Sequence, residues 1–148
     1  MMSIKLARWI PSFVSVFIFS TILTIAYSWP PYYWMDVKTI QVDNSKVGEE
    51  IPMTVRREIY RSFKGNWVVT IRRFEGDWTV WCNATGVSNY NEQATLPKDL
   101  TMKWWTNGQC YPLPPGKYQV TTSWEINPTN LLPNKLIVSE SNIFEVKT

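Results

Sequence analysis

The sequence has no histidine and only two cysteines among its 148 residues. The lack of histidine excludes the Ser–His and Cys–His pairs that activate many nucleophiles. Two cysteines alone cannot complete a four-ligand zinc site, and their spacing does not form a C-x-x-C redox motif. We therefore expect no metal and no cofactor. An enzyme would need a pair of carboxylates on facing strands, and no stretch of the sequence points to one.

The two cysteines, Cys82 and Cys110, have two possible states. In a domain outside the cytoplasm we expect a disulfide, which would stabilise the fold by roughly 3–4 kcal/mol on the chain-entropy model. In a cytoplasmic domain they would be two buried free thiols. The location of the domain therefore decides between these states.

The chain also has little excess charge. It has 15 basic and 12 acidic residues, but Lys5 and Arg8 precede the apolar N-terminal segment. The rest of the chain is therefore nearly neutral and has no basic excess with which to neutralise phosphates. We do not expect nucleic acid among its partners.

An apolar segment without charge lies near the N-terminus. Residues 9–29 supply about 20 residues, enough for a helix to cross a hydrocarbon core of roughly 30 Å. Aromatic residues flank this segment at both ends, and Lys5 and Arg8 lie on its N-terminal side, which indicates a cytoplasmic N-terminus. The sequence thus predicts a short cytoplasmic tail (1–8), a transmembrane helix in contact with membrane lipid (9–29), an aromatic linker (30–35) and an extracytoplasmic domain (36–148).

The same segment also has features of a cleaved signal peptide. Ala26 and Ser28 occupy positions −3 and −1 of a possible cleavage site before Trp29. The sequence Trp29-Pro30-Pro31 is an unfavourable context for a peptidase that needs extended backbone, which favours retention of the segment. Under both interpretations the domain is exported, either anchored or secreted.

Beyond Met35 the pattern is that of short strands. Apolar and polar residues alternate in runs that turn residues separate, and no segment keeps a helical period for three turns. This pattern predicts an all-β domain, an antiparallel β-sandwich of about seven strands. Lys64-Gly65-Asn66 and Glu75-Gly76-Asp77 are predicted to be tight turns, and residues 100–104 a strand.

The stretch LPPGKYQVTTSW, residues 113–124, has the form L-x-x-G-x-Y-x-V. It resembles the tyrosine-corner strand of fibronectin type III and related Ig-like domains. The resemblance implies that the hydroxyl of Tyr118, two residues after Gly116, bonds to the backbone of the preceding loop, while Val120 enters the core.

Two further features bear on this resemblance. The ending SNIFEV, residues 141–146, is similar to the terminal strand of many bacterial and phage Ig-like modules. Cys82 and Cys110, however, do not match the positions of the inter-sheet disulfide of immunoglobulin domains. The resemblance implies a fold and export but no particular activity.

Six basic residues lie on two stretches that a short turn would make adjacent. They could form a cationic strip that binds anionic headgroups, polysaccharide or a protein partner. The alternative is a solvated face offset by nearby acidic residues, which we favour because sheet faces commonly carry cross-strand charge pairs. The six residues are Arg56, Arg57, Arg61, Lys64, Arg72 and Arg73.

A second candidate patch consists of Trp81, Trp105, Asn107 and Gln109. Neighbours on a strand point to opposite faces, so one ring of the Trp104-Trp105 pair should face solvent. Exposed aromatic rings beside amide side chains are typical of carbohydrate platforms and of protein hot spots. Alternatively, the sheet edge or the following loop covers these rings.

These observations favour a non-catalytic interaction or display module, anchored in a membrane, that binds a protein or a glycan near the outer membrane face. The alternative is a secreted or virion-associated binding module released by cleavage after Ser28.

Overall fold

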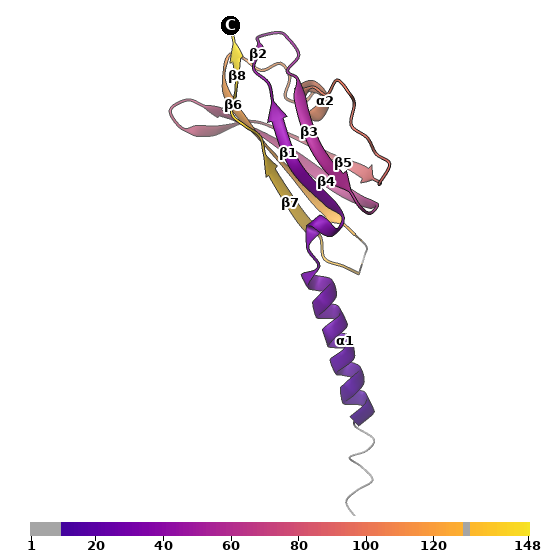
Figure 1. Cartoon of the computed structure of the whole chain (residues 1–148). Coiled ribbons are helices and arrows are strands. Elements are labelled where there is room, and N and C mark those ends of the chain that lie inside the picture. Colours follow the sequence, from indigo (N-terminus) through magenta and orange to yellow (C-terminus); the bar gives the residue numbers. More distant parts are fainter. Residues whose placement is uncertain (1–9, 129–130) are drawn as a thin grey trace, which may run out of the picture.

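Two β-sheets pack face to face in the computed structural model, which describes residues 10–128 and 131–148 (Figure 1). The smaller sheet pairs β1 (Met35–Val42) with β3 (Met53–Ile59). The larger sheet has the order β2-β8-β6-β4-β5, with β7 also paired to β6. Its strands are β2 (Ser45–Lys46), β4 (Phe63–Phe74), β5 (Trp78–Tyr90), β6 (Gly116–Asn127), β7 (Lys135–Glu140) and β8 (Phe144–Lys147). The predicted β-sandwich is confirmed.

The larger sheet is mixed, so the prediction of a purely antiparallel fold is wrong. β2 runs parallel to β8, with Ser45 opposite Val146. The Asn44 side-chain oxygen accepts the Glu145 N–H at 2.7 Å, and the Val47 N–H donates to the Lys147 carbonyl oxygen. These bonds hold the short segment after β1 against the C-terminal strand, in an orientation that alternating hydrophobicity does not encode.

The core lies between the sheets. The inward-facing residues of β4 and β6 alternate with exposed or half-buried ones, as expected when one face of each strand is covered. The largest fully buried side chains include Trp124, Tyr118, Phe144, Met35, Ile71 and Val120.

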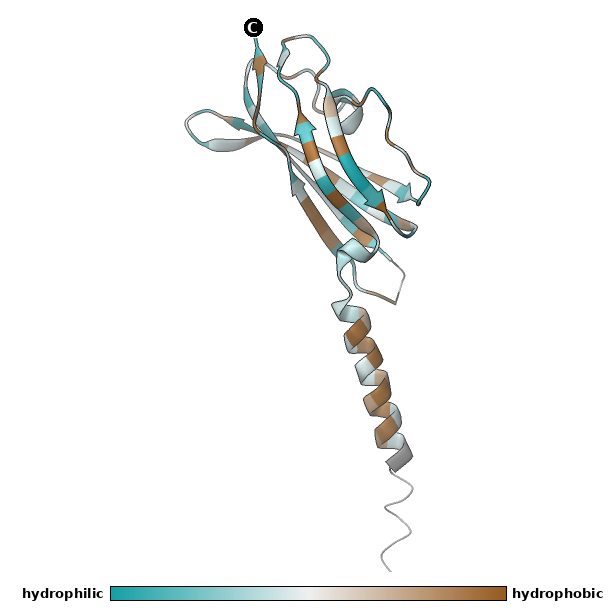
Figure 2. Ribbon diagram, in the orientation of Figure 1, coloured by the Kyte–Doolittle hydropathy of each residue, from teal (hydrophilic) through white to brown (hydrophobic). Residues whose placement is uncertain are grey.

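The N-terminal segment forms α1 (Ile10–Ser28), a helix that stands apart from the sandwich in Figure 1. Apolar side chains such as Phe17, Phe19 and Ile22 are exposed along it, and Figure 2 shows apolar residues spread over its length. The Thr21 hydroxyl donates to a carbonyl oxygen four residues earlier, so this polar group is satisfied within the helix.

The predicted transmembrane helix (9–29) is wrong. Among the residues that the structure describes, no helix is both long and apolar enough to cross a membrane. The prediction reached about 20 residues only by adding residues 9–12 and 27–29 to the strongly apolar stretch between them. The helix ends at Ser28, whereas Trp9 and the predicted tail (1–8) lie outside the described residues.

The segment assigned to the linker (30–35) packs onto the domain. Pro31–Tyr33 form a 3-10 helix, η2, and both Trp34 and Met35 are buried. The Trp34 carbonyl oxygen accepts the N–H groups of Tyr60 and Arg61, which joins this segment to the end of β3. Its backbone is therefore held by the sandwich.

Two local predictions are wrong for different reasons. Gly65 lies inside β4 and not in a turn. Its surroundings leave no room for a side chain, since an added Cβ would meet the Glu125 carbonyl oxygen at 3.1 Å and the Phe63 ring at 3.0 Å. Glycine is needed there for close approach of the backbone and not for a turn conformation. In contrast, Gly76 does turn the chain between β4 and β5, with φ +85°.

The segment 100–104 does not form a strand. Met102–Trp105 form α2, a single helical turn that Thr101 begins as its N-cap. The Thr101 hydroxyl oxygen accepts the Trp104 N–H at 3.4 Å, and Asn107 and Gly108, both at positive φ, follow the helix. The cap and these two residues fix a helical turn where alternation alone indicated a strand.

Cys82 on β5 and Cys110 after α2 form a disulfide, so that prediction is confirmed. The bond closes a loop over a sequence separation of 28 residues.

Replacing both cysteines with serine should lower the free energy of unfolding by about 3–4 kcal/mol, because the bond restricts the unfolded chain. Urea unfolding of the oxidised wild type and of the double variant measures this difference. A loss below about 1 kcal/mol would contradict the expectation from loop closure.

Candidate functional site

A cleft of about 1030 Å³ opens between the two sheets, beside β3 and α2. The two-stranded sheet is too narrow to cover the inner face of β4, β5 and β6 along its whole width. Part of that inner face therefore borders an open space. Trp104 and the half-buried Trp67 are accessible in the cleft, whereas Tyr90, Trp105 and Trp124 are buried beneath it.

The Trp67 indole lies against β5 at Gly86. A Cβ at Gly86 would come within 2.3 Å of the indole carbon Cζ2, so the ring occupies the space that any other side chain would fill. One face of the ring is thus against the β5 backbone, and the residue also lines the cleft. Trp67 therefore forms a flat apolar wall that β5 supports from behind.

The two tryptophans of α2 have different roles. Trp105 is buried, and its indole N–H donates to the Thr122 hydroxyl oxygen at 3.0 Å. Its ring also makes an edge contact with Trp124 at 6.1 Å between centroids. Trp104 is 52% exposed and lines the cleft. Trp105 therefore anchors α2 in the core, while Trp104 is free to contact a ligand.

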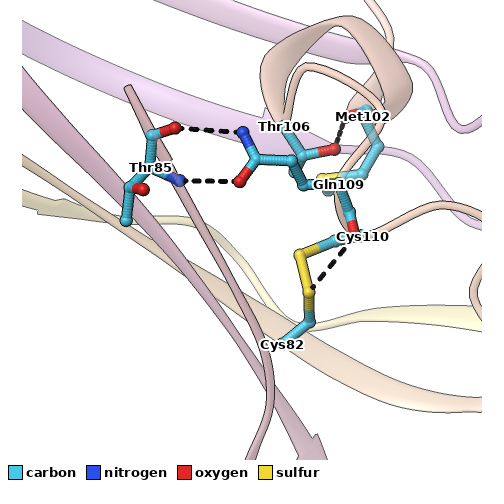
Figure 3. Close-up of a disulfide and its surroundings, with 6 residues drawn as sticks. All are labelled: Cys82, Thr85, Met102, Thr106, Gln109 and Cys110. Carbon is cyan, nitrogen blue, oxygen red and sulfur yellow. Dashed lines mark hydrogen bonds between the residues drawn. A yellow bond between two sulfur atoms is a disulfide. The ribbon is translucent and has the colours of Figure 1, made fainter. Parts of the chain in front are cut away.

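A disulfide and an amide side chain hold the segment around α2 on β5 (Figure 3). Gln109 makes two bonds to the Thr85 backbone, accepting its N–H at 3.2 Å and donating to its carbonyl oxygen at 3.0 Å. Cys110, next to Gln109, forms the disulfide with Cys82, which lies on β5 three residues before Thr85. The Thr106 hydroxyl donates to the Met102 carbonyl oxygen at 2.9 Å and closes the helical turn. The wall that carries Trp104 is therefore fixed.

Arg57 lies on the opposite wall, on β3. Its guanidinium carbon is 5.3 Å from the centroid of the Tyr90 ring, a cation–π contact. Burial lowers the pKa of the Arg57 guanidinium below its ordinary value, although Tyr90 opposes the shift, and burial raises the pKa of the Tyr90 hydroxyl. The buried Nε atom of Arg57 has no hydrogen-bond partner. The cleft thus contains a partly desolvated cation with an unused donor.

Acidic and basic groups are nearly balanced elsewhere in the lining. Glu50 and Asp99 lie at the end of the cleft where β3 begins, because Leu100, next to Asp99, accepts the Met53 N–H. Lys103 lies near them on α2 and contacts the Tyr111 ring. Within residues 10–128 and 131–148, no three His, Cys, Asp or Glu side chains lie together in a way that could hold a metal ion.

The structure separates the four residues of the predicted aromatic patch. Asn107 lines the cleft beside Trp104, and Trp105 is in the core. The Gln109 side chain is bound to β5. Trp81 lies outside the cleft, 46% exposed, with the Arg73 guanidinium 5.0 Å from its ring.

The structure also does not bring the six basic residues into one strip, because β3 and β4 belong to different sheets. Arg56 and Arg57 are on β3, and Arg61 follows it, stacked on the Tyr33 ring at 4.1 Å. Lys64, Arg72 and Arg73 are on β4. Arg72 pairs with Glu140 and Arg73 with Glu75, both at 3.0 Å.

The residues of the tyrosine motif lie at the start of β6. The Tyr118 hydroxyl donates to the Pro114 carbonyl oxygen at 2.7 Å, and Val120 is fully buried. Gly116 leaves room for Arg73, whose Nε atom would be 2.9 Å from an added Cβ. None of these residues lines the cleft, and the Tyr118 bond holds the loop before β6.

No protein family, curated protein or solved structure matches this chain in the comparisons.

Sequence reasoning missed most of the cleft, including Gly86, Tyr90, Trp104 and the role of Arg57. The sequence contained one signal for this site, since Gly86 interrupts a strand that is rich in β-branched and aromatic residues. In the structure Gly86 lies opposite Trp67 of the neighbouring strand β4. A glycine inside a strand often marks the close approach of another group.

The two α2 tryptophans should respond differently to truncation. Trp105→Ala removes a buried ring and its hydrogen bond, and should lower the free energy of unfolding by about 3–5 kcal/mol. Trp104→Ala removes a half-exposed ring and should cost less than about 1 kcal/mol. Denaturant unfolding of the two variants compares them directly, and equal losses would contradict the assignment.

Proposed function

We propose that this chain is a non-catalytic, exported interaction module with an Ig-like β-sandwich that binds a protein or a glycan in its aromatic cleft. The observation that carries the proposal is the open cleft, in which Trp67 and Trp104 are fixed from behind by Gly86 and by the disulfide-held segment. Rigid aromatic side chains in a concave site lose little conformational entropy on binding, which is typical of recognition surfaces.

The Cys82–Cys110 disulfide supports export. Disulfides persist in oxidising compartments and are rare in the reducing cytosol. The apolar side chains of α1 have no cover from the sandwich, as expected of a segment that is removed during export. We infer secretion with cleavage after Ser28, which would begin the mature chain at Trp29.

Two features support the Ig-like assignment. The Tyr118 hydroxyl on β6 bonds to the loop that precedes β6, and Val120 is buried in the core. The order of pairing, with β6 between β4 and β8, is also compatible with such a sandwich.

The site predicts a difference between two exposed tryptophans. The purified full chain is tested against an immobilised glycan array and a displayed random peptide library. For ligands recovered from either set, Trp104→Ala should weaken binding at least tenfold, because truncation of a central aromatic residue commonly costs 2 kcal/mol or more.

Trp81→Ala is the matched control, since this ring is exposed to a similar degree but lies outside the cleft. It should change affinity less than about twofold. If Trp81→Ala abolished binding while Trp104→Ala did not, the cleft would not be the site. Failure to recover any ligand from either set would also count against the proposal.

Export with cleavage predicts a mature N-terminus at Trp29. Intact-mass measurement of the chain recovered from the compartment outside the cytoplasm should show loss of residues 1–28. A full-length mass there would exclude cleavage, and recovery of the chain only from the cytoplasm with reduced cysteines would exclude export.

A further inference from the structure

One edge of the smaller sheet has backbone groups without a partner strand. β3 pairs with β1 on one side only. The Met53 N–H turns away from β1, because it donates to the Leu100 carbonyl oxygen at 2.8 Å. Backbone groups two residues apart on a strand turn to the same side, so those of Val55 and Arg57 also lie on this free edge. Beyond the bridge between Pro52 and Thr101, no described strand pairs with it.

A gap of about 480 Å³ runs along this edge. β3 residues 55–58 line one side and residues 94–96 the other. Residues 94–96 belong to no strand and donate no backbone hydrogen bond to β3. The space beside the free edge is therefore bordered by chain but contains no pairing partner, and an exposed edge of this kind is a template for another strand.

The charge beside the gap is positive. Lys38 also lines it, but its ammonium pairs with the Glu58 carboxylate at 2.6 Å. Arg56 and Arg57 form no ion pair with a described carboxylate. Glu50 and Asp99 are near the start of β3, and Arg57 is four residues beyond Met53, roughly 13 Å at 3.3 Å per residue. An incoming segment would therefore meet two guanidinium groups that form no ion pair with a described carboxylate.

The gap also communicates with the aromatic cleft, because Arg57 and Ala94 line both. Side chains of an extended segment point alternately to opposite faces. A strand added to β3 would direct every second side chain into the cleft that Trp67 lines, and the others toward solvent beside Arg56. Backbone groups, charge and apolar surface are thus arranged for one kind of occupant.

We propose that β3 accepts an extended acidic segment of a partner protein, which adds to its free edge as a new strand and inserts apolar side chains into the cleft. This proposal rests on the proposed function and specifies its ligand as protein. The backbone of the segment bonds to Val55 and Arg57, and its solvent-facing carboxylates lie beside Arg56. Arg57 points into the cleft, where its unused Nε donor can bond an oxygen of the segment. A glycan would satisfy the aromatic rings but would leave the strand edge without its regular pairing.

The experiment selects peptides from a random decapeptide library with the full chain as bait. Enriched sequences should alternate apolar and acidic residues, and their binding should fall at least tenfold with Val55→Pro. Proline removes an N–H that faces the free edge, so pairing with β1 is retained. Asn83→Pro is the matched control, because Asn83 lies on the free edge of β5, two residues before the Gln109-bound Thr85, and lines neither the cleft nor the gap.

A second measurement does not depend on the folding of a variant. Alternate N–H groups of a bound strand point toward β3 and away from it. N-methylation of the set that points toward β3 should abolish binding of an enriched peptide, whereas N-methylation of the other set should not. The wild-type Val55 and Arg57 amides should also exchange hydrogen at least tenfold more slowly when the unmodified peptide is bound. The double variant Arg56→Gln/Arg57→Gln should weaken binding at least fivefold, whereas Lys64→Gln on β4 should not.

The outcomes separate this inference from the proposed function. If peptide binding is lost with Trp104→Ala but is unchanged by Val55→Pro and by N-methylation, the strand-addition proposal is wrong and the proposal of binding in the cleft stands. The same holds if cellohexaose or chitohexaose binds in the cleft and no peptide is enriched. If no peptide and no oligosaccharide responds to Trp104→Ala, both proposals fail.

Discussion

The disulfide between Cys82 and Cys110 secures the part of the sandwich that no strand completes. Between β5 and β6 the chain forms a loop and a single helical turn in place of a strand beside β3. Such a segment has no ladder of backbone bonds to hold it. The disulfide, the Gln109 bonds to Thr85 and the buried Trp105 ring take the place of that ladder. Because they hold the segment, the cleft beside it stays open and its walls keep their shape.

The same arrangement explains why Arg57 is partly buried without an anion. A strand beside β3 would normally cover it, and burial of a cation without a partner is unfavourable. Stacking on Tyr90 offsets part of this cost. A ligand that supplies oxygen acceptors would gain a charge-assisted hydrogen bond at a group that is already desolvated. Arg57 is therefore a source of binding free energy.

The strand pattern of this chain was visible in the sequence, whereas the cleft was not. Alternation predicted a domain of short strands, the stretches 113–124 and 141–146 overlap β6 and β8, and Glu75-Gly76-Asp77 forms the predicted turn. Gly65 and Gly76 have similar polar neighbours, yet one sits inside a strand because there is no room for a Cβ and the other turns the chain. Only the packed structure distinguishes these two uses of glycine. Likewise, the Thr101 cap changed which ring of the Trp104–Trp105 pair is buried.

The Gln109 side chain has a further consequence for the behaviour of the molecule in concentrated solution. β5 is a long strand on the edge of the larger sheet, and an unbroken edge of that length invites two copies to join side by side and aggregate. The Gln109 amide occupies the hydrogen-bonding groups of Thr85 in the middle of β5. It divides the edge into two shorter stretches, and neither has a long continuous row of free backbone groups to which another strand could bond. The contact that shapes the cleft thus also protects the chain against self-association.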